Sequence, residues 1–295
     1  MFQIVILSVL VGSALTAQGT KWKYGETDKV HKIYGPKDWG KVSKYCDGSA
    51  QSPINIETRS VENEGSLKRL RFLAENRYGR VSGVLENNGH APTLAIDKPR
   101  GTSTLTGGPL GNSVYKLQQL HIHFGCENNK GSEHTVNGKA FSGELHLVHY
   151  NTKYGDFKTA VDKRDGLAVI GVFLQGDDED DSSYSLKIIS GATRYIRKAG
   201  SKKPIRAIYL NNLVPHLRDL SEFYSYKGSL TTPPCYQSVK WIVLKRPIRA
   251  SEYVLRAFRS LLNDEEQPMC DNFRPTLPLN SRSVSQSDDD DRLFN

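Results

Sequence analysis

Short segments rich in β-branched and aromatic residues recur along the interior of the chain, and glycine, proline or asparagine bounds most of them. Their apolar positions repeat with a period closer to two than to 3.6, which is typical of β-strands. The pattern predicts strands over residues 120–125, 143–151, 166–175, 204–210 and 238–248.

Helical patterning is weaker and is confined to two segments. Apolar spacings of three and four residues predict helices over residues 181–196 and 251–264. Ser251 opens the second segment and is of a type preferred at helix N-caps. No internal repeat and no linker divides the interior.

Length and composition agree with one folded unit. The chain has 295 residues, which exceeds an average domain but is common for one large β-rich domain. Its 37% of hydrophobic residues can fill a substantial core, and its 24% of charged residues exclude disorder over the whole length. We therefore predict a mainly β (α+β) protein with a single domain over residues 18–280 and peripheral short helices.

The N-terminus is predicted to be a secretory signal peptide. Residues 1–17 form an apolar run that ends in small residues, and we expect cleavage after Ala14 or Ala17. No lysine or arginine precedes the run, and a membrane anchor is the alternative. However, about 15 apolar residues are short for a bilayer span of about 20. We expect a secreted, extracellular protein without a membrane anchor, since the C-terminus also lacks a hydrophobic segment.

A secreted destination changes how the cysteines are interpreted. Cys46, Cys126, Cys235 and Cys270 can pair in an oxidising compartment, and four cysteines permit three full connectivities. Spacing alone does not choose among them. The chain contains no N-x-[ST] sequon, so N-glycosylation is not expected.

The formal net charge of +8 is unevenly distributed. Basic residues cluster over Arg194–Arg206, and acidic residues cluster over Gly176–Ser183 and in a polar tail, residues 281–295. Such runs are usually solvated loops, and a face that binds a polyanion is the alternative for the basic cluster. The acidic tail lacks the ordered ligands of a dedicated calcium loop, so we expect at most weak calcium or mineral contact. We expect no nucleic-acid partner.

Two histidines stand out in the first predicted strand. On a strand, His121 and His123 point to one face and Ile122 and Phe124 to the other, whereas a helix would separate the two imidazoles by about 200°. Gln119 has the same parity as the histidines. The strand is therefore the geometry in which both imidazoles can share one partner.

The next predicted strand offers a third imidazole. Glu144, His146 and Val148 fall on one face of residues 143–151, and His149 falls on the other. If the two strands become antiparallel neighbours, His146 joins the first pair in a three-ligand arrangement like that of open catalytic zinc sites. Histidines hydrogen-bonded within a core are the alternative, and the residues alone leave both interpretations open.

A series of stretches then identifies a family. QSPINIET, NNGHAP, LHIHFG, GSEHTVNGKAFSGELHLVHYN, GLAVIGVFL and SLTTPPC occur in the order found in α-class carbonic anhydrases, and the resemblance runs from about Trp22 to Leu279. The chain resembles the secreted members of that family. The resemblance implies a large, mostly antiparallel, twisted central sheet. It also implies reversible hydration of carbon dioxide to bicarbonate and a proton by attack of zinc-bound hydroxide. We also expect a monomer.

The resemblance assigns roles position by position. The implied zinc ligands are His121, His123 and His146, supported by Gln119, the backbone carbonyl of Asn272, and Glu144. Glu133 and Thr231 resemble the pair that orients the nucleophile, and His90 resembles the proton shuttle. The remaining matches are Asn88 and Tyr24, which order water, Val148, Val169, Leu230 and Trp241, which form the apolar substrate wall, and Thr232 on its wetter side.

The cysteines match the family in part. Cys46 and Cys235 resemble the pair bridged in secreted members, and Cys126 and Cys270 are candidates for a second disulfide. Phe124 and Tyr150 replace tryptophans common in the family, and Thr93 occupies a variable position; these departures bear on rate rather than on the reaction. An inactive carbonic-anhydrase-related binding or matrix protein is the alternative, although such proteins typically lack a ligand histidine.

Overall fold

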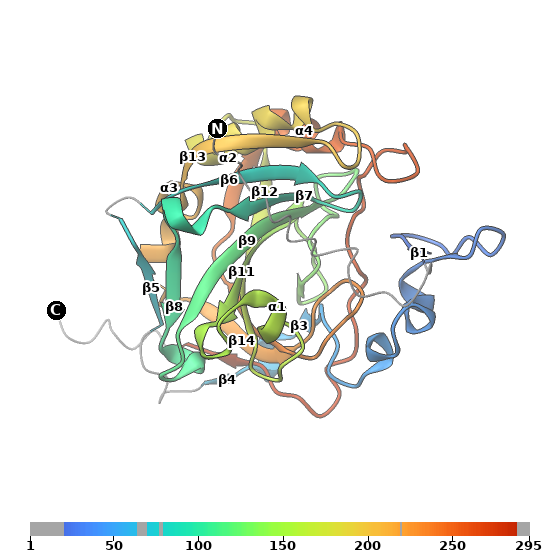
Figure 1. The fold of residues 1–295 in the computed structure, drawn as a ribbon. Helices are drawn as coiled ribbons and strands as arrows, with labels where there is room; N and C mark the ends of the chain where they lie inside the picture. Colours follow the sequence, from blue (N-terminus) through green and yellow to red (C-terminus); the bar gives the residue numbers. More distant parts are fainter. Residues whose placement is uncertain (1–20, 64–69, 77–78, 219, 288–295) are drawn as a thin grey trace.

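A long, twisted β-sheet runs through the centre of the molecule (Figure 1). The structure is a computed structural model that describes residues 21–63, 70–76, 79–218 and 220–287. The predicted signal peptide and residues 288–295 of the acidic tail lie outside these ranges. Within them, no helix combines the length and the apolar character needed to cross a membrane.

Among the described residues, the main sheet has thirteen strands, ten of which follow the order β13-β6-β7-β9-β11-β12-β15-β14-β17-β4. Most neighbouring strands are antiparallel, and β12 is parallel to both β15 and β16. The mostly antiparallel central sheet is thus confirmed. Its strands are β4 (Glu62–Asn63), β5 (Arg71–Ala74), β6 (Arg80–Asn87), β7 (Pro92–Ile96), β8 (Ser103–Thr106), β9 (Tyr115–Phe124), β11 (Gly143–Asn151), β12 (Leu167–Asp177), β13 (Lys202–Tyr209), β14 (Phe223–Gly228), β15 (Val239–Leu244), β16 (Ile248–Ser251) and β17 (Ser285–Gln286).

Shorter elements surround the sheet. Two small parallel pairs join β1 (Lys21–Trp22) to β2 (Ile33–Tyr34) and β3 (Asn55–Ile56) to β10 (Thr135–Val136). The described residues form four short α-helices: α1 (Phe157–Ala160), α2 (Tyr184–Ala192), α3 (Leu210–Leu213) and α4 (Glu252–Arg259). The 3-10 helices among the described residues span Pro36–Lys41, Lys44–Asp47, Thr58–Ser60, Lys98–Arg100, Gly108–Leu110, Thr152–Tyr154, Thr193–Tyr195 and Pro215–Arg218.

Periodicity located five of the strand regions and both longer helices, whereas β6, β7 and β14 were missed. The strand predicted over residues 143–151 has the bounds of β11, and residues 120–125 fall almost entirely within the longer β9. The predicted strand over residues 238–248 is β15 and the start of β16. α4 begins after Ser251, whose hydroxyl accepts a hydrogen bond from the backbone N–H of Val254, as expected for an N-cap.

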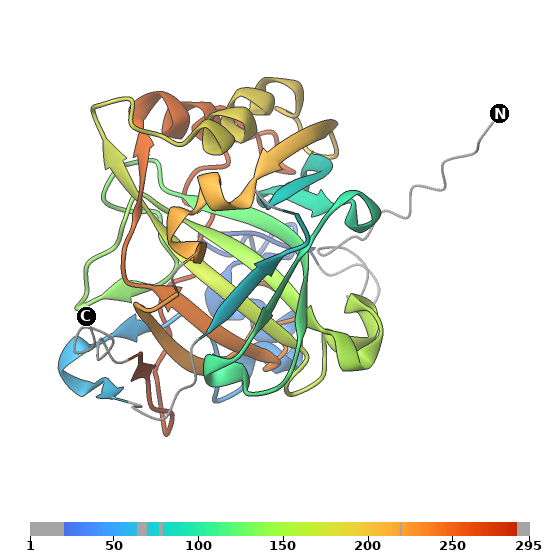
Figure 2. The ribbon, with the colours of Figure 1, turned by 90° about the vertical axis from the view of Figure 1, so that its left-hand side faces the viewer.

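The two faces of the sheet pack against different partners. Leu120 and Ile122 of β9 point into the larger core, which α2 and α4 cover with apolar residues such as Leu186 and Phe258. The two helices lie together at the top of Figures 1 and 2. Because side chains alternate along a strand, Gln119, His121 and His123 face the opposite side, away from these helices. A β-bulge at Gln118 shifts this alternation, so that Leu117 also points into the larger core.

The folded part continues past the expected domain boundary at residue 280. β17 pairs antiparallel with β14 and parallel with β4, and Val284 is buried. Within the segment expected to be a polar tail, residues 281–287 therefore belong to the fold. Apolar periodicity could not predict this extension, because β17 contains only a serine and a glutamine.

Two disulfides cross-link the structure. Cys46 is bonded to Cys235 and Cys126 to Cys270, which selects one of the three connectivities. The first closes a loop of 189 residues. In the chain-entropy model such a loop stabilises the folded state by about 5 kcal/mol.

The acidic run over residues 176–183 is largely paired within the protein. Arg249 lies within ion-pair distance of Asp177, Glu179 and Asp181, and Lys187 bonds to Asp180 at 2.9 Å. These carboxylates neutralise neighbouring cations, which supports the interpretation of this run as a solvated loop.

Candidate active site

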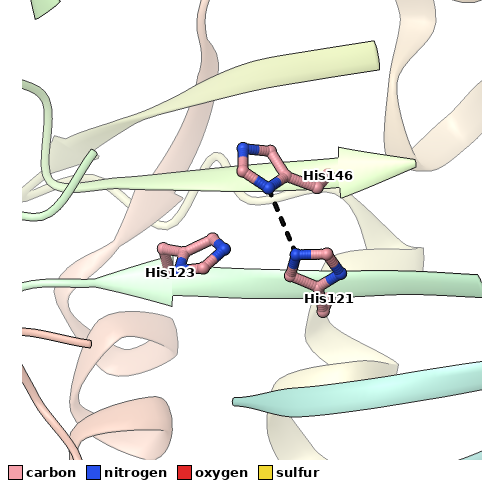
Figure 3. A group of neighbouring side chains, drawn as sticks. All are labelled: His121, His123 and His146. Atoms are coloured by element: carbon pink, nitrogen blue, oxygen red, sulfur yellow. Dashed lines mark hydrogen bonds between the residues drawn. The ribbon is translucent and has the colours of Figure 1, made fainter. Parts of the chain in front are cut away.

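Three histidine side chains meet on one face of the sheet (Figure 3). β9 carries His121 and His123, and β11 carries His146, which pairs directly with His121 across the antiparallel ladder. The centroids of the three rings lie 4.7 to 5.0 Å apart. The strand alternation seen in the sequence thus brings the imidazoles together around one point.

One nitrogen of each ring faces an oxygen acceptor. The pairs are His121 Nδ1 with Gln119 Oε1 at 3.2 Å, His123 Nδ1 with the Asn272 carbonyl at 2.7 Å, and His146 Nε2 with Glu144 Oε1 at 2.8 Å. Carbonyl and carboxylate oxygens only accept hydrogen bonds, so each of these ring nitrogens carries the proton. The other nitrogen of each neutral ring is then left with a lone pair.

These lone pairs converge. His121 Nε2, His123 Nε2 and His146 Nδ1 lie within 4.8 Å of one another. The 3.2 Å contact between His146 and His121, dashed in Figure 3, joins two nitrogens that have no proton to share when both rings are neutral. It matches the separation of about 3.3 Å between two ligands of a tetrahedral zinc ion with bonds of 2.0–2.1 Å. His123 Nε2 is buried with no hydrogen-bond partner among the described residues. The donor set therefore fits a metal ion.

Burial keeps the rings in the form that binds a metal. It lowers the pKa of His123, and together with the charges of the neighbouring imidazoles it holds the pKa of His121 well below the usual range. Both rings are neutral at neutral pH. Neutral imidazole is the form that ligates metals.

Glu144 organises the surroundings of His146. Its Oε1 also accepts a hydrogen bond from His134 Nδ1 at 2.7 Å, and its Oε2 accepts the backbone N–H groups of Glu133 and His134. Burial alone raises the pKa of Glu144, but His134 and His146 together hold it well below the usual range. The carboxylate is therefore ionised and fixed at both oxygens.

Sequence analysis missed the outer part of this network. His134 Nε2 hydrogen-bonds Tyr226 Oη at 2.7 Å, and Tyr226 Oη hydrogen-bonds Ser52 Oγ at 2.8 Å. His134 lies between two strands, where no periodicity applies, and Ser52 lies far from it in sequence. The only available signal was the position of His134 inside a family-like stretch.

The segment around Asn272 holds β9 and the His90 turn. The Asn272 side-chain oxygen accepts from Phe124 N at 2.7 Å, and its amide nitrogen donates to the His90 carbonyl at 2.9 Å. The disulfide between Cys126 and Cys270 attaches this segment to the residues that follow β9. The carbonyl that orients His123 is thus fixed on several sides.

Glu133 is buried beside the ligand nitrogens. Its Oε1 accepts the backbone N–H of Arg274 at 2.9 Å, and its Oε2 lies 3.4 Å from His123 Nε2. Oε2 has no hydrogen-bond partner among the described residues, so the expected bond from Thr231 is not formed at that oxygen, although Thr231 is buried. Arg274, another residue that sequence analysis missed, has a guanidinium that donates to Gln51 Oε1 and to backbone carbonyls.

An apolar wall stands next to the histidines. Val148, Val169 and Trp241 are direct neighbours across β11, β12 and β15, and all three are buried. The Trp241 ring lies 4.9 Å from the His146 ring. Leu230 packs against the same cluster and is partly exposed, while Thr232 lies in the turn before Cys235. The arrangement offers contact area without hydrogen bonds beside the metal-binding nitrogens.

His90 lies at the edge of a pocket of about 470 Å³ that Trp22, Tyr24 and Asp264 also line. Its ring stacks on Trp22 with centroids 3.7 Å apart, and burial lowers its pKa to about 4. The Tyr24 hydroxyl is buried without a hydrogen-bond partner among the described residues.

Asn88 orders the turn that carries His90. Its side-chain oxygen accepts the backbone N–H groups of His90 and Ala91, and its amide donates to Thr93 Oγ1. Its visible contacts are therefore with the turn itself.

Residues on the other face of the ligand strands belong to the core. His149 Nδ1 donates to the Leu147 carbonyl at 2.9 Å, and burial lowers the pKa of His149 to about 4. Phe124 stacks against Phe258 of α4 with ring centroids 5.7 Å apart. His149 is thus a core residue separated from the three-histidine cluster by the sheet.

The chain belongs to the eukaryotic-type carbonic anhydrase family, whose model matches residues 34–288. It is 41% identical over 271 residues to carbonic anhydrase 7 of Mus musculus and 40% identical to that of Homo sapiens, covering 90% of this chain and 97% of each relative. It is 36% identical over 257 residues to carbonic anhydrase 3 of Homo sapiens, covering 86% of this chain and 95% of that protein. The protein is thus an enzyme of the carbonic anhydrase type.

We predict that Gln119→Leu weakens Zn²⁺ binding by about tenfold, because it removes the acceptor that orients His121 while filling a similar volume. A competition titration with a chromogenic chelator measures the affinity. Gln118→Leu is the matched control, since Gln118 is also buried on β9 but accepts from Lys98 instead. Equal affinities for the Gln119 variant and the wild type would contradict the orienting role.

Proposed function

We propose that this protein catalyses the reversible hydration of carbon dioxide to bicarbonate and a proton, with Zn²⁺ at the three histidines. The observation that carries the proposal is the convergence of three imidazole nitrogens, with each ring fixed at its other nitrogen by a separate acceptor. An inactive relative used only for binding is disfavoured, because the donor set is complete.

Zinc bound by three imidazoles would act as a Lewis acid and lower the pKa of a bound water. Carbonic anhydrases are the established example: they obtain a nucleophile from water near neutral pH in this way. The protein fixes the three nitrogens in advance. With these three ligands, a zinc ion would keep one coordination position for water or substrate.

The apolar wall receives carbon dioxide. The substrate has no net dipole, so Val148, Val169, Leu230 and Trp241 offer it contact without a competing hydrogen bond. Thr232 stands on the polar side. Bicarbonate is charged and gains nothing from an apolar surface, so this wall favours its departure.

Glu133 and Thr231 orient the nucleophile. A threonine hydroxyl has one proton to donate. If it donates a hydrogen bond to Glu133 Oε2, the Thr231 lone pairs point elsewhere and can accept a hydrogen bond from the attacking group, which orients that group. Glu133 Oε2 is buried and available for this bond. The backbone N–H of Arg274 holds the other oxygen in place.

His90 exports the proton. The ring is neutral at pH 7 while it is stacked on Trp22, because burial lowers its pKa to about 4. The ring therefore accepts a proton only when it moves away from Trp22 and becomes more exposed to water. It releases the proton readily when it returns to the stacked position. Tyr24 lies at the same pocket and borders the path of the connecting water.

We predict that His146→Ala abolishes carbon dioxide hydration and most Zn²⁺ binding, because two imidazoles do not complete the site. Stopped-flow hydration and metal analysis of the purified protein measure both. His31→Ala is the control, since His31 is exposed and pairs with Asp28. Full activity in the His146 variant would overturn the ligand assignment and the proposed function.

We predict that His90→Ala lowers turnover at low buffer concentration by about a hundredfold, which is typical of losing a positioned proton-transfer group. Imidazole buffer should restore the rate, because it replaces the missing carrier. Turnover that is low in every buffer would show instead that the substitution damages the site. In the wild type, NMR should show His90 titrating near pH 4, and Trp22→Ala should raise that pKa toward 6.5.

We also propose that the protein is secreted and acts as a monomer. The two disulfides support an oxidising compartment. Expression of the full chain in a secretory cell should release protein that begins after Ala14 or Ala17 and contains no free thiol by mass spectrometry. Retention inside the cell with four free thiols would contradict secretion.

A further inference from the structure

A basic groove lies on the side of the sheet that α2 and α4 cover. A hollow of about 840 Å³ runs between α2, β13 and α4, and its cationic lining residues are Lys187, Arg194, Lys203, Arg206 and Arg256. A second hollow of about 460 Å³ is lined by Arg80, Arg100 and again Arg206. Arg206 therefore joins the two into one surface, which we call the basic groove.

No carboxylate lines either hollow among the described residues. Lys187, Arg256 and Arg100 have ion-pair partners outside the groove. Arg80, Arg194, Lys203 and Arg206 have no carboxylate within ion-pair distance in the part of the chain that the structure describes. Like charges held close together without counter-charges create a positive potential that attracts anions.

Aromatic rings hold part of this charge in place. Arg194 lies 4.8 Å and Lys203 4.3 Å from the centroid of the Tyr195 ring, and Arg194 donates to the Tyr195 hydroxyl at 2.9 Å. Tyr253 of α4 also lines the groove and is 71% exposed. The groove therefore presents ordered cations beside flat apolar rings, a surface suited to the charged groups and ring faces of a polymer.

We propose that the basic groove binds a sulfated polysaccharide. Two hollows that share Arg206 place cations over an area that suits a polyanion. Lysine- and arginine-rich clusters of this kind are a recognised feature of heparin-binding surfaces. With secretion as proposed above, sulfated polysaccharides are the class of polyanion that the protein meets outside the cell.

The protein's own acidic tail is a poorer occupant. The tail follows β17, whereas the groove lies at β13, and these strands are eight steps apart in the sheet order. The point at which the tail leaves the fold and the groove thus lie at different parts of the sheet, and a peptide with the tail sequence is tested as a competing occupant.

A polysaccharide bound in the groove should leave carbon dioxide hydration unaffected. The sheet separates the groove from the histidines, because α2 and α4 pack on the face opposite His121 and His146. The proposal thus stands independently of the catalytic one. Binding and activity are separable in a single preparation.

The test compares two triple variants of the full mature protein on immobilised heparin. R194Q/K203Q/R206Q should bind at least about tenfold more weakly than the wild type and elute at lower salt, because binding polyanions releases counterions. K29Q/K32Q/K44Q removes the same charge from exposed residues outside the groove and should bind like the wild type. Circular dichroism checks that both variants fold, and carbon dioxide hydration should be unchanged in both.

Three outcomes would overturn the proposal. Equal weakening in both variants would show that net charge alone governs binding. Equal affinity for desulfated heparin would show that sulfate is not recognised. Tighter binding of a DNA duplex or of a peptide with the sequence of residues 284–295 would assign the groove to another partner.

Discussion

The structure depends on holding three lone pairs close together inside a protein. Such an arrangement is unfavourable unless each ring has its other nitrogen satisfied, and the fold supplies a separate acceptor for each: Gln119, the Asn272 carbonyl and Glu144. Two of these acceptors lie on the ligand strands themselves. The third arrives from a distant segment, which is why the C-terminal part of the chain must fold back against β9.

The register between β9 and β11 is the geometric basis of this arrangement. A slip by one residue would turn His146 into the apolar core and bring Leu145 or Leu147 to the metal-binding face. Glu144 limits such a slip, because it binds His146 on its own strand and the backbone of Glu133 and His134 in the neighbouring loop. Catalytic geometry and strand pairing are thus maintained by the same contacts.

The features that could be predicted from sequence are those that depend on a regular pattern of side chains within one strand or helix. Alternation along two strands placed three histidines on one face, and apolar periodicity located α2 and α4, because these features depend on near neighbours. β6, β7 and β14 were missed as elements, since their patterns are less distinct. His134, Tyr226 and Arg274 act across long sequence separations from loops or mixed strands, and no periodicity marks them. The family resemblance supplied the roles that alternation alone left open.

The sheet also acts as a partition between two surfaces with different physical demands. On one face, side chains are buried, oriented and mutually dependent, so nearly any substitution there alters several contacts at once. On the other face, most cationic side chains of the basic groove are exposed. Substitutions in the groove of such an enzyme can change which extracellular material binds it. The reaction on the opposite face of the sheet stays the same.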